Sequence, residues 1–546
     1  MAGGGAHGGG EAADPVVTRY VEQDKVAWYN KPNLRALYFL LLPTCMGVEM
    51  TSGFDSSMMN GLQGVTYWDN FFGKPRGNLL GIMSSMYSLG AICALPLVPI
   101  INDRLGRRAA IMFGSILMII GAALQASSIN YAMFVMSRWI LGLGIPFAIV
   151  AASTLIGELS YPKERAVMTS LFNASWFVGA IIAAGVTFGT FDMKSNWSWR
   201  IPSLLQAVPS LLQISFVYFI PESPRWLISK GRRDDAFDIL VKYHAEGDRE
   251  SEFVKAEFAQ IESTLKIEQE NANRGWKELF ATPGMRRRVI IASFLGLFTQ
   301  WSGNGMISRI STSYYLKRIL EGVGITNNRT VNEINLANTC WGFVNGTIFA
   351  LSVYKFKRRP MYLACTISLL CVYVGWTTSA ALYTTRGDKA ASHAVLAMIF
   401  LYSPAYNLGY NALTYTFLVE LFPFTVRSRG IAIFQWWGRA AGFFNQYVNP
   451  IGISNAGWKY YISYCVWLAF EIIFVFFMFP ETSGRTLEEL TFLFEPEEIK
   501  RRQQKNAEDV LHGGVPGQIF TPGSPISPSV DKENIHEIEQ LENRRV

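Results

Sequence analysis

Charged side chains are scarce in this sequence. Asp, Glu, Lys and Arg make up 17% of the 546 residues, whereas soluble domains average about 25%. Half of the residues are apolar, and aromatic side chains are abundant. This composition argues against an ordinary soluble domain and favours a membrane protein. The net charge of +7 does not indicate a nucleic-acid partner, because the basic residues lie in short loops between apolar runs.

Metal-binding and catalytic signatures are also missing. The six cysteines lie in or beside apolar segments, without a C-x-x-C pair or a neighbouring histidine, so we expect no metal site and no disulfide framework. The sequence has no nucleophile elbow, P-loop or zinc motif. We therefore expect neither an enzyme nor an ATP-driven pump, and no cofactor. Residues 1–35 lack the apolar core of a signal peptide.

Long apolar runs are what the sequence has instead. A helix needs about 20 apolar residues to cross a bilayer. Twelve runs meet this requirement, and helices are the only spanning structure that fits them: 36–59, 79–101, 109–128, 131–154, 168–189, 200–219, 288–308, 334–353, 361–381, 392–414, 430–452 and 457–479. We predict an all-α membrane protein with twelve transmembrane helices.

Basic residues set the expected orientation. They concentrate in the short loops "DRLGRR", "SYPKERA", "YKFKRRP" and "VRSRG", which the positive-inside rule places in the cytoplasm. Both termini are then cytoplasmic, and the sequons at Asn196 and Asn328 fall in outer loops, where glycosylation is possible.

Composition divides the chain into five expected parts. They are a largely disordered N-terminal tail (1–35), a six-helix half (36–220), a cytoplasmic linker of short amphipathic helices (221–287), a second six-helix half (288–480) and a C-terminal tail (481–546) that is mostly disordered after 500.

Three short patterns occur twice, in the same order. "GELSYPKERA" matches "VELFPFTVRSR", "PESPRWL" matches "PETSGRTL", and "DRLGRRA" matches "YKFKRRP", at offsets of 262, 259 and 251 residues. Similar offsets indicate a duplicated six-helix unit. Two pseudo-symmetric halves around a midplane site are a transporter architecture.

These patterns resemble the sugar porter family of the major facilitator superfamily over residues 36–495. "PESPRWL" and "PETSGRTLEEL" are selective, while "GFDSSMMNGLQ" and "QWSGNG" are similar to fungal lactose, cellodextrin and hexose permeases. The resemblance implies a plasma-membrane sugar transporter, most simply a monomeric proton symporter of a mono- or disaccharide. A sugar sensor with little transport and a passive carrier remain alternatives.

Charged residues inside spanning helices are costly and are usually functional. Asp55 in the first helix and Arg138 in the fourth lie at similar depth, so a pair is geometrically reasonable. An arginine neighbour favours the ionised carboxylate and burial favours the protonated one. The resemblance implies that Asp55 carries the proton and Arg138 tunes it. A static ion pair that fixes helix packing is the alternative.

Three further charged residues lie within the runs. Glu49 points about 120° away from Asp55 on a helix, so we expect it outside the same site. Arg439 and Glu471 lie at similar depth in the last two helices, and we expect them to form a structural pair.

A sugar requires uncharged donors and acceptors in fixed directions, and aromatic rings pack against its apolar faces. Intramembrane amides also form hydrogen bonds between helices, which is the alternative for each candidate. The resemblance implies a binding set of Gln300, Asn173, Trp176, Asn304, Asn345, Tyr415, Asn445 and Gln446, with Gln300 foremost.

The charges of the inner loops resemble the family's cytoplasmic gate, in which ion pairs close the inner end of the cavity. The implied residues are Asp103, Arg104, Arg107, Arg108, Glu158, Arg165, Glu420 and Arg427. The seven-residue spacing from Glu158 to Arg165 recurs from Glu420 to Arg427, which favours a gate over a simple topology signal.

The sequence departs from the family in three places. Five extra residues, 309–313, rotate the end of the seventh helix by about 140°. Tyr354 and Lys357 stand where the family has Asp and Gly, which predicts a weaker gate in the second half. The family's asparagine in the seventh helix falls on Gly305, which weakens the case for Asn304.

Overall fold

The computed structural model describes residues 20, 23–75, 78–271, 275–304, 328–485, 490 and 493–494. All regular elements among these residues are helices, as predicted. Residues 1–496 form one compact unit, to which all these elements belong. Three features predicted from the sequence lie outside this description. They are the inserted residues 309–313, the side chain of Asn328 and the two tails expected to be disordered, apart from the described residues of 20–35.

The first half of the helices forms what we term the N-lobe. Its elements are η1 (Trp28–Asn30), α2 (Pro32–Leu41), the π-helical turn η2 (Leu42–Met46), α3 (Gly47–Leu62), α4 (Thr66–Phe71), α5 (Asn78–Ala94), α6 (Val98–Leu105), α7 (Arg107–Ala126), α8 (Tyr131–Leu159), α9 (Arg165–Thr190), α10 (Trp197–Leu205) and α11 (Ala207–Val217).

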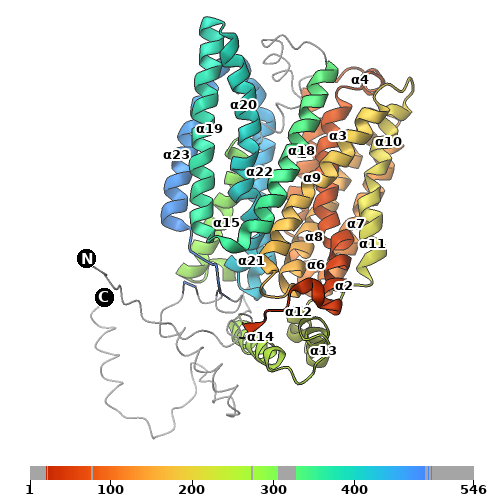
Figure 1. Cartoon of the computed structure of the whole chain (residues 1–546). Coiled ribbons are helices and arrows are strands. Elements are labelled where there is room, and N and C mark those ends of the chain that lie inside the picture. The colour runs from red at the N-terminus through yellow and green to blue at the C-terminus, as the bar shows by residue number, and fades with distance from the viewer. Residues whose placement is uncertain are drawn as a thin grey trace, which may run out of the picture. The chain divides into compact units, whose positions relative to one another are not determined.

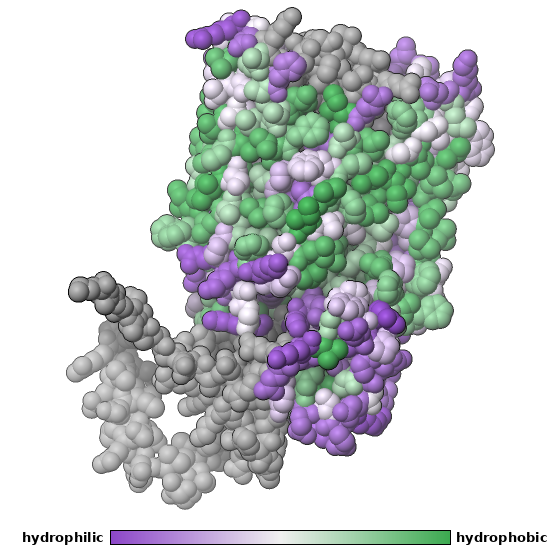
Figure 2. Space-filling view, in the orientation of Figure 1, coloured by the Kyte–Doolittle hydropathy of each residue, from purple (hydrophilic) through white to green (hydrophobic). Residues whose placement is uncertain are grey.

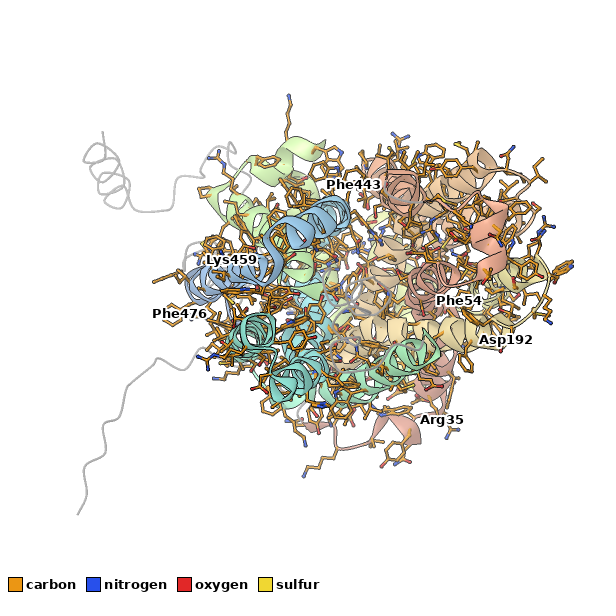
Figure 3. The ribbon with its side chains drawn as sticks, turned by 90° about the horizontal axis from the view of Figure 1, so that it is seen from above. Arg35, Phe54, Asp192, Phe443, Lys459 and Phe476 are labelled. Carbon is orange, nitrogen blue, oxygen red and sulfur yellow. The ribbon has the colours of Figure 1, made fainter. Side chains whose placement is uncertain are left out.

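The second half forms the C-lobe. Its elements are α15 (Pro283–Trp301), α18 (Asn328–Ser352), η4 (Val353–Lys355), α19 (Arg358–Arg386), α20 (Lys389–Tyr406), the π-helical turn η5 (Asn407–Asn411), α21 (Ala412–Leu421), α22 (Phe424–Ala456), η6 (Gly457–Lys459) and α23 (Tyr460–Met478). Seen from above, the helices gather into two groups, with Phe54 in the N-lobe and Phe476 at the outer edge of the C-lobe (Figure 3).

A helix or a broken helix coincides with each of the twelve expected runs. Among the described residues, six helical stretches are long and apolar enough to cross a membrane, and α5 with α6, bent by 52° at their break, make a seventh if the pair is counted as one span. The bend lies beside Pro96 and Pro99, where a helix loses backbone donors. The run 200–219 is divided into α10 and α11 at Gln206, and the run 392–414 contains η5.

An apolar band crosses the visible face of the two lobes (Figure 2). Large apolar side chains on α23 face outward, and 67% of Val466 and 70% of Phe477 is exposed. Hydrophilic side chains gather instead at the two ends, most densely over α12–α14 (Figure 2). This distribution suits a multi-pass membrane protein, in which lipid covers the band.

The linker between the lobes consists of α12 (Pro224–Ser229), α13 (Arg233–His244), α14 (Glu252–Asn271) and η3 (Gly275–Phe280), as the amphipathic pattern predicted. Helices α13 and α14 bury a small apolar core of their own. We term the end of the lobes that carries α12–α14 the linker face (Figure 1). Glu246, just after α13, accepts hydrogen bonds from the backbone amides of Asn33 (2.8 Å) and Leu34 (3.0 Å) and thereby caps α2.

The internal repeat is visible in equivalent contacts of the two lobes. In the N-lobe, Glu222 accepts from the backbone amides of Arg107 (3.1 Å) and Arg108 (3.2 Å) at the start of α7. In the C-lobe, Glu481 accepts from those of Arg358 (2.9 Å) and Arg359 (3.2 Å) at the start of α19. A carboxylate at a helix N-terminus satisfies free amides and complements the helix dipole.

A second carboxylate repeats in the same way. Glu158 accepts from Ser223 Oγ (2.5 Å) and lies 3.4 Å from Arg107 Nε. In the C-lobe, Glu420 accepts from Thr482 Oγ1 (2.6 Å) and from Arg358 Nη2 (3.1 Å). The lobes are therefore pseudo-symmetric in their side-chain contacts as well as in their helices.

The altered loop of the second half keeps this geometry. Gly106 has φ +95°, and an added Cβ would lie 2.5 Å from Glu222 Oε2, so glycine is required there. Lys357, its counterpart, has φ −72° and needs no glycine. Tyr354, in place of the family's Asp, is 58% exposed.

Candidate functional site

A buried carboxylate with three hydrogen bonds lies at the centre of the N-lobe. Asp55 on α3 accepts from Arg138 Nη1 (3.0 Å) and Nη2 (3.1 Å) on α8, and Gln206 Nε2 donates to it at 2.8 Å. All three side chains are buried. Paired N–H groups on both carboxylate oxygens form a strong, directional ion pair.

Glycine lets α3 approach its neighbours closely enough for this arrangement. An added Cβ at Gly53 would lie 1.9 Å from the carbonyl oxygen of Trp176, and one at Gly179 would lie 1.9 Å from that of Met50. Helices α3 and α9 therefore touch through their backbones. This contact holds α3 in register, with Asp55 turned toward α8.

The ring of Tyr87 on α5 lies beside two guanidinium groups. The Cζ atoms of Arg138 on α8 and of Arg439 on α22 each lie 5.5 Å from its centroid. These distances are within the range of cation–π attraction. Since Arg439 belongs to the C-lobe, Tyr87 links the Asp55 cluster to the other half of the chain.

Glu49, expected outside the Asp55 site, is buried on α3, and none of the described hydrogen bonds joins it to Asp55. The Arg439 charge and the Tyr415 hydroxyl, both in the C-lobe, act on its carboxylate electrostatically. Gln435 Nε2 in turn donates to the Tyr415 hydroxyl at 2.5 Å. Glu49 thus lies near a candidate sugar-binding residue, although its neighbours are not those of Asp55.

The expected Arg439–Glu471 pair is wrong. Glu471 on α23 accepts from the Tyr410 hydroxyl (2.8 Å) within the C-lobe, whereas Arg439 contacts Tyr87. Equal depth could not decide this, because depth along a helix does not give the direction in which a side chain points.

Several candidate amides lie where the lobes meet. Asn173 Nδ2 on α9 donates to the carbonyl of Asn411 in the C-lobe (2.6 Å). Asn345 on α18 accepts from Asn407 Nδ2 (2.5 Å), and Asn345 Nδ2 donates to the carbonyl of Trp341 (2.6 Å). The polar side chains at this meeting point come from α9, α18 and the turn η5.

The remaining binding candidates form a second group. Asn445 on α22 donates to the backbone carbonyl of Gln300 (3.0 Å), which holds α15 against α22. Asn304 makes two long contacts of 3.4 Å, one with the Tyr406 hydroxyl and one with the Thr299 carbonyl in α15. Trp176 is partly buried, with its ring edge against Phe177. The side chain of Gln446 lies outside the described residues.

The charged residues at the linker face join the lobes through one central contact. Arg427 Nη1 of the C-lobe donates to Glu158 Oε1 (2.9 Å), and both side chains are buried. Asn102 donates to Ser428 Oγ nearby (2.6 Å), and Asp103 interacts with Ser428 and Arg429. The linker face is closed by these contacts.

Arg104 and Arg108, both expected in the gate, do not take part in this closure. Arg108 donates to the carbonyls of Val217 and Tyr218 (both 3.0 Å), which ties α7 to the end of α11 within the N-lobe. Arg104 is exposed at the end of α6, and no contact joins it to the described part of this cluster. A basic residue in an inner loop can serve topology alone.

A buried histidine attaches the linker to the N-lobe. His244 Nδ1 lies 2.7 Å from Glu257 Oε2, and Nε2 lies 3.3 Å from the carbonyl of Leu159 at the end of α8. Burial acts to raise the pKa of Glu257, but His244, Arg225 and Arg165 outweigh it and hold this pKa below the ordinary value. The linker is thus joined to the helix that carries Glu158.

Sequence reasoning missed several polar residues that make these contacts. Gln206, Gln435, Asn407 and Asn411 all lie within apolar runs, where a polar side chain is itself a signal. The Nδ2 atom of Asn411 and the Oε1 atom of Gln206 are buried without a hydrogen-bond partner in the described structure. Such groups have capacity for a further partner.

Comparisons with known proteins agree with this architecture. Residues 40–494 match a family model described as "Sugar (and other) transporter". The chain is 27% identical to the High-affinity glucose transporter 1 of Candida albicans, covering 85% of this chain and 87% of the relative. It is 25% identical to the MFS-type transporter criB of Aspergillus cristatus, covering 86% and 97%.

A solved structure shares the fold. It is that of the proton:xylose symporter XylE bound to 6-bromo-6-deoxy-D-glucose, with a TM-score of 0.74 and 21% identity. The alignment covers 85% of this chain and all of that one.

Proposed function

The chain belongs to the sugar transporter family, the sugar porters of the major facilitator superfamily, and from this membership we propose that it carries a mono- or disaccharide together with a proton. Transport proceeds by alternating access, in which the lobes rock about a central site. In this proposal the protein is a monomer in the plasma membrane, with the linker face and both termini in the cytoplasm. Its partners are the sugar, the proton and the lipid bilayer.

The Asp55 cluster supports proton coupling. Asp55 is a buried carboxylate in a spanning helix, and Arg138 and Gln206 donate hydrogen bonds to it. When the proton binds, the ion pair with Arg138 weakens, and its guanidinium is left beside the Tyr87 ring, against which Arg439 of the C-lobe also packs. Protonation therefore changes the charge balance at the point where the N-lobe meets the C-lobe.

Proton coupling would make accumulation possible. One proton moving through 100 mV contributes ~2.3 kcal/mol, and one pH unit adds ~1.4 kcal/mol. Together they support roughly 500-fold accumulation of a neutral solute.

The amides between the lobes are suited to hold the sugar. We assign binding to Gln300, Asn173, Asn345, Asn445 and Tyr415, with Trp176 as an apolar surface and Asn304 and Gln446 as further candidates. Asn173 already bridges the lobes through its Nδ2 atom, which leaves its oxygen for a sugar hydroxyl.

The substitution Asp55→Asn tests the coupling. The variant should lose accumulation of labelled sugar but retain exchange of sugar across the membrane, because the amide cannot bind and release a proton. The measurement is uptake and counterflow in vesicles with an imposed proton gradient. Glu471→Gln is the matched control, since it neutralises a buried carboxylate that lies away from Arg138.

Concentrative uptake by Asp55→Asn at the level of the unmodified chain would refute the assignment. Uptake by the unmodified chain that is unaffected by an uncoupler would instead indicate a passive carrier.

A further inference from the structure

Hydroxyl side chains join α9 of the N-lobe to α21 of the C-lobe. Thr169 Oγ1 lies 2.6 Å from Thr416 Oγ1, and Ser170 Oγ donates to the carbonyl of Ala412 at 2.5 Å. Ser170 Oγ also lies 3.2 Å from Thr416 Oγ1. Each of the three hydroxyl-bearing side chains is at most 2% exposed. We term Thr169, Ser170, Thr416 and the Ala412 carbonyl the hydroxyl seam.

The hydroxyl seam lies between the linker face and the candidate sugar site. One helical turn beyond Thr169, Asn173 Nδ2 donates to the carbonyl of Asn411 in the C-lobe (2.6 Å). On the same side of α9, the Phe172 ring lies edge-on to Tyr415, with centroids 5.0 Å apart. Opening of the linker face must separate α9 from α21, so the bonds of the seam cannot persist in that state.

The two hydroxyls on α9 also have acceptors on their own helix. Ser170 Oγ lies 2.6 Å from the carbonyl of Ala166, and Thr169 Oγ1 lies 2.9 Å from that of Arg165. A hydroxyl carries one hydrogen, so Ser170 can donate fully either to Ala412 or to Ala166. When the lobes separate, Ser170 can therefore keep a hydrogen bond within α9.

The hydroxyl on α21 gains an acceptor in the same step. The Ala412 carbonyl, which Ser170 releases, lies four residues before Thr416 in the helix. A threonine hydroxyl in a helix can donate to the carbonyl at that position. Separation of the seam thus leaves no hydroxyl without an acceptor, whereas separation of the buried Glu158–Arg427 pair leaves two charges that must be hydrated.

We propose that Thr169, Ser170 and Thr416 are positioning residues of the transport cycle, which hold α21 against α9 while the linker face is closed and bond to their own helices when it opens. The proposal rests on the proposed transport by alternating access. It adds an uncharged contact between the lobes to Glu158–Arg427. Because both states satisfy the hydroxyls, the seam favours the closed state modestly and can separate in every cycle.

Hydrogen exchange of the full-length protein in nanodiscs tests this without any sugar. Exchange of backbone amides reports how often a segment opens. The reporters are α6 and residues 424–430, which meet at the linker face through Asn102 and Ser428 and contain no altered residue. In Thr169→Val and in Thr416→Val, which keep the side-chain shape, both reporters should exchange about threefold faster. Threefold corresponds to ~0.6 kcal/mol, the average for one interhelical hydrogen bond in a membrane.

The double variant Thr169→Val/Thr416→Val shows whether the two hydroxyls contact each other. Both single changes remove the same bond, so the double variant should exchange about as fast as either single one, rather than about ninefold faster than the unmodified chain. Thr169→Ser retains the hydroxyl and should exchange like the unmodified chain. Ser170→Ala removes the other bond of the seam and should accelerate the same reporters.

Thr187→Val is the matched control. Thr187 is buried on the same helix and donates to the carbonyl of Ala183 (2.7 Å) within α9. The change removes a hydroxyl from α9 without removing a bond between the lobes, so the reporters should be unaffected. Helix α7 is the internal reference, because it packs against α8, α10 and α11 of the N-lobe.

Unchanged exchange at both reporters in Thr169→Val, Thr416→Val and Ser170→Ala would overturn the proposal. A ninefold effect of the double variant, or an acceleration that Thr187→Val reproduces or that extends equally to α7, would overturn it as well. If the reporters respond as expected in a chain that carries no sugar, the seam holds and the proposed function fails. The two failures are therefore distinguishable.

Discussion

At the scale of single residues, the buried acids inside the bundle differ in their partners. Asp55, Glu49 and Glu471 are three buried carboxylates with three different sets of partners. Their environments assign them different roles: Asp55 within the N-lobe, Glu49 between the lobes and Glu471 within the C-lobe. Buried carboxylates in this bundle therefore differ in role according to the side chains around them.

Gln300 offers a test of sugar binding at this scale. Gln300→Ala removes an amide from α15 but leaves the backbone carbonyl that Asn445 contacts. We expect the affinity for sugar to fall by ~1–3 kcal/mol, the range for one lost buried hydrogen bond, with protein abundance unchanged. Competition binding with a labelled sugar measures this.

Gln63→Ala is the corresponding control, because Gln63 bonds to a carbonyl of its own helix. An affinity equal to that of the unmodified chain in Gln300→Ala would remove this residue from the site.

The Asp55–Arg138 contact could be foreseen because both residues carry charge at one depth of two helices in the same half. The contacts of Glu49 could not. Helical geometry gave its direction relative to Asp55, but Tyr415 and Arg439, which act on its charge, come from the other half of the chain. Only the packing of the lobes brings them together, and a single sequence does not contain that information.

At the scale of helices, the two carboxylates that cap α7 and α19 are the clearest sign of duplication. Glu222→Gln and Glu481→Gln each weaken an anionic cap on two backbone amides. Each should lower the free energy of unfolding by about 1 kcal/mol, and by similar amounts, since the geometry is the same. Thermal unfolding of the purified protein measures the change.

Glu250→Gln provides the comparison, because Glu250 is an exposed acid on the linker. If both cap variants unfolded like this control, the caps would contribute no measurable stability.

The helices themselves were readable from apolar length, and the interruptions were not. The turns η2 and η5 have no simple sequence signal, although Pro43 lies in the first of them. The turn η5 matters most for the site, because it carries both Asn407 and Asn411. The period of an ordinary helix does not predict which way these two asparagines face.

At the scale of the whole molecule, the linker helices connect to the N-lobe through a titratable contact. The pKa of Glu257 lies below its ordinary value of 4.5 in the folded protein. Its contribution to stability is therefore complete above pH 4.5 and is lost as the pH falls through the lowered pKa. We expect the melting temperature to decline over this acidic range.

The variant Glu257→Gln isolates this contribution. It should melt at a lower temperature than the unmodified chain at pH 7, and the difference between the two should shrink as the pH falls below 4.5. A difference that stays constant from pH 7 to pH 3 would contradict the assignment.

The cap on α2 has a consequence for biosynthesis. Asn33 and Leu34 begin the first long helix, yet the carboxylate that binds their amides belongs to Glu246, 213 residues after Asn33. At typical rates of translation this acid emerges roughly 10–40 s later. During that interval the newly made helix can be in the membrane while its first turn is still bound to water, so the N-lobe is completed only when the linker leaves the ribosome.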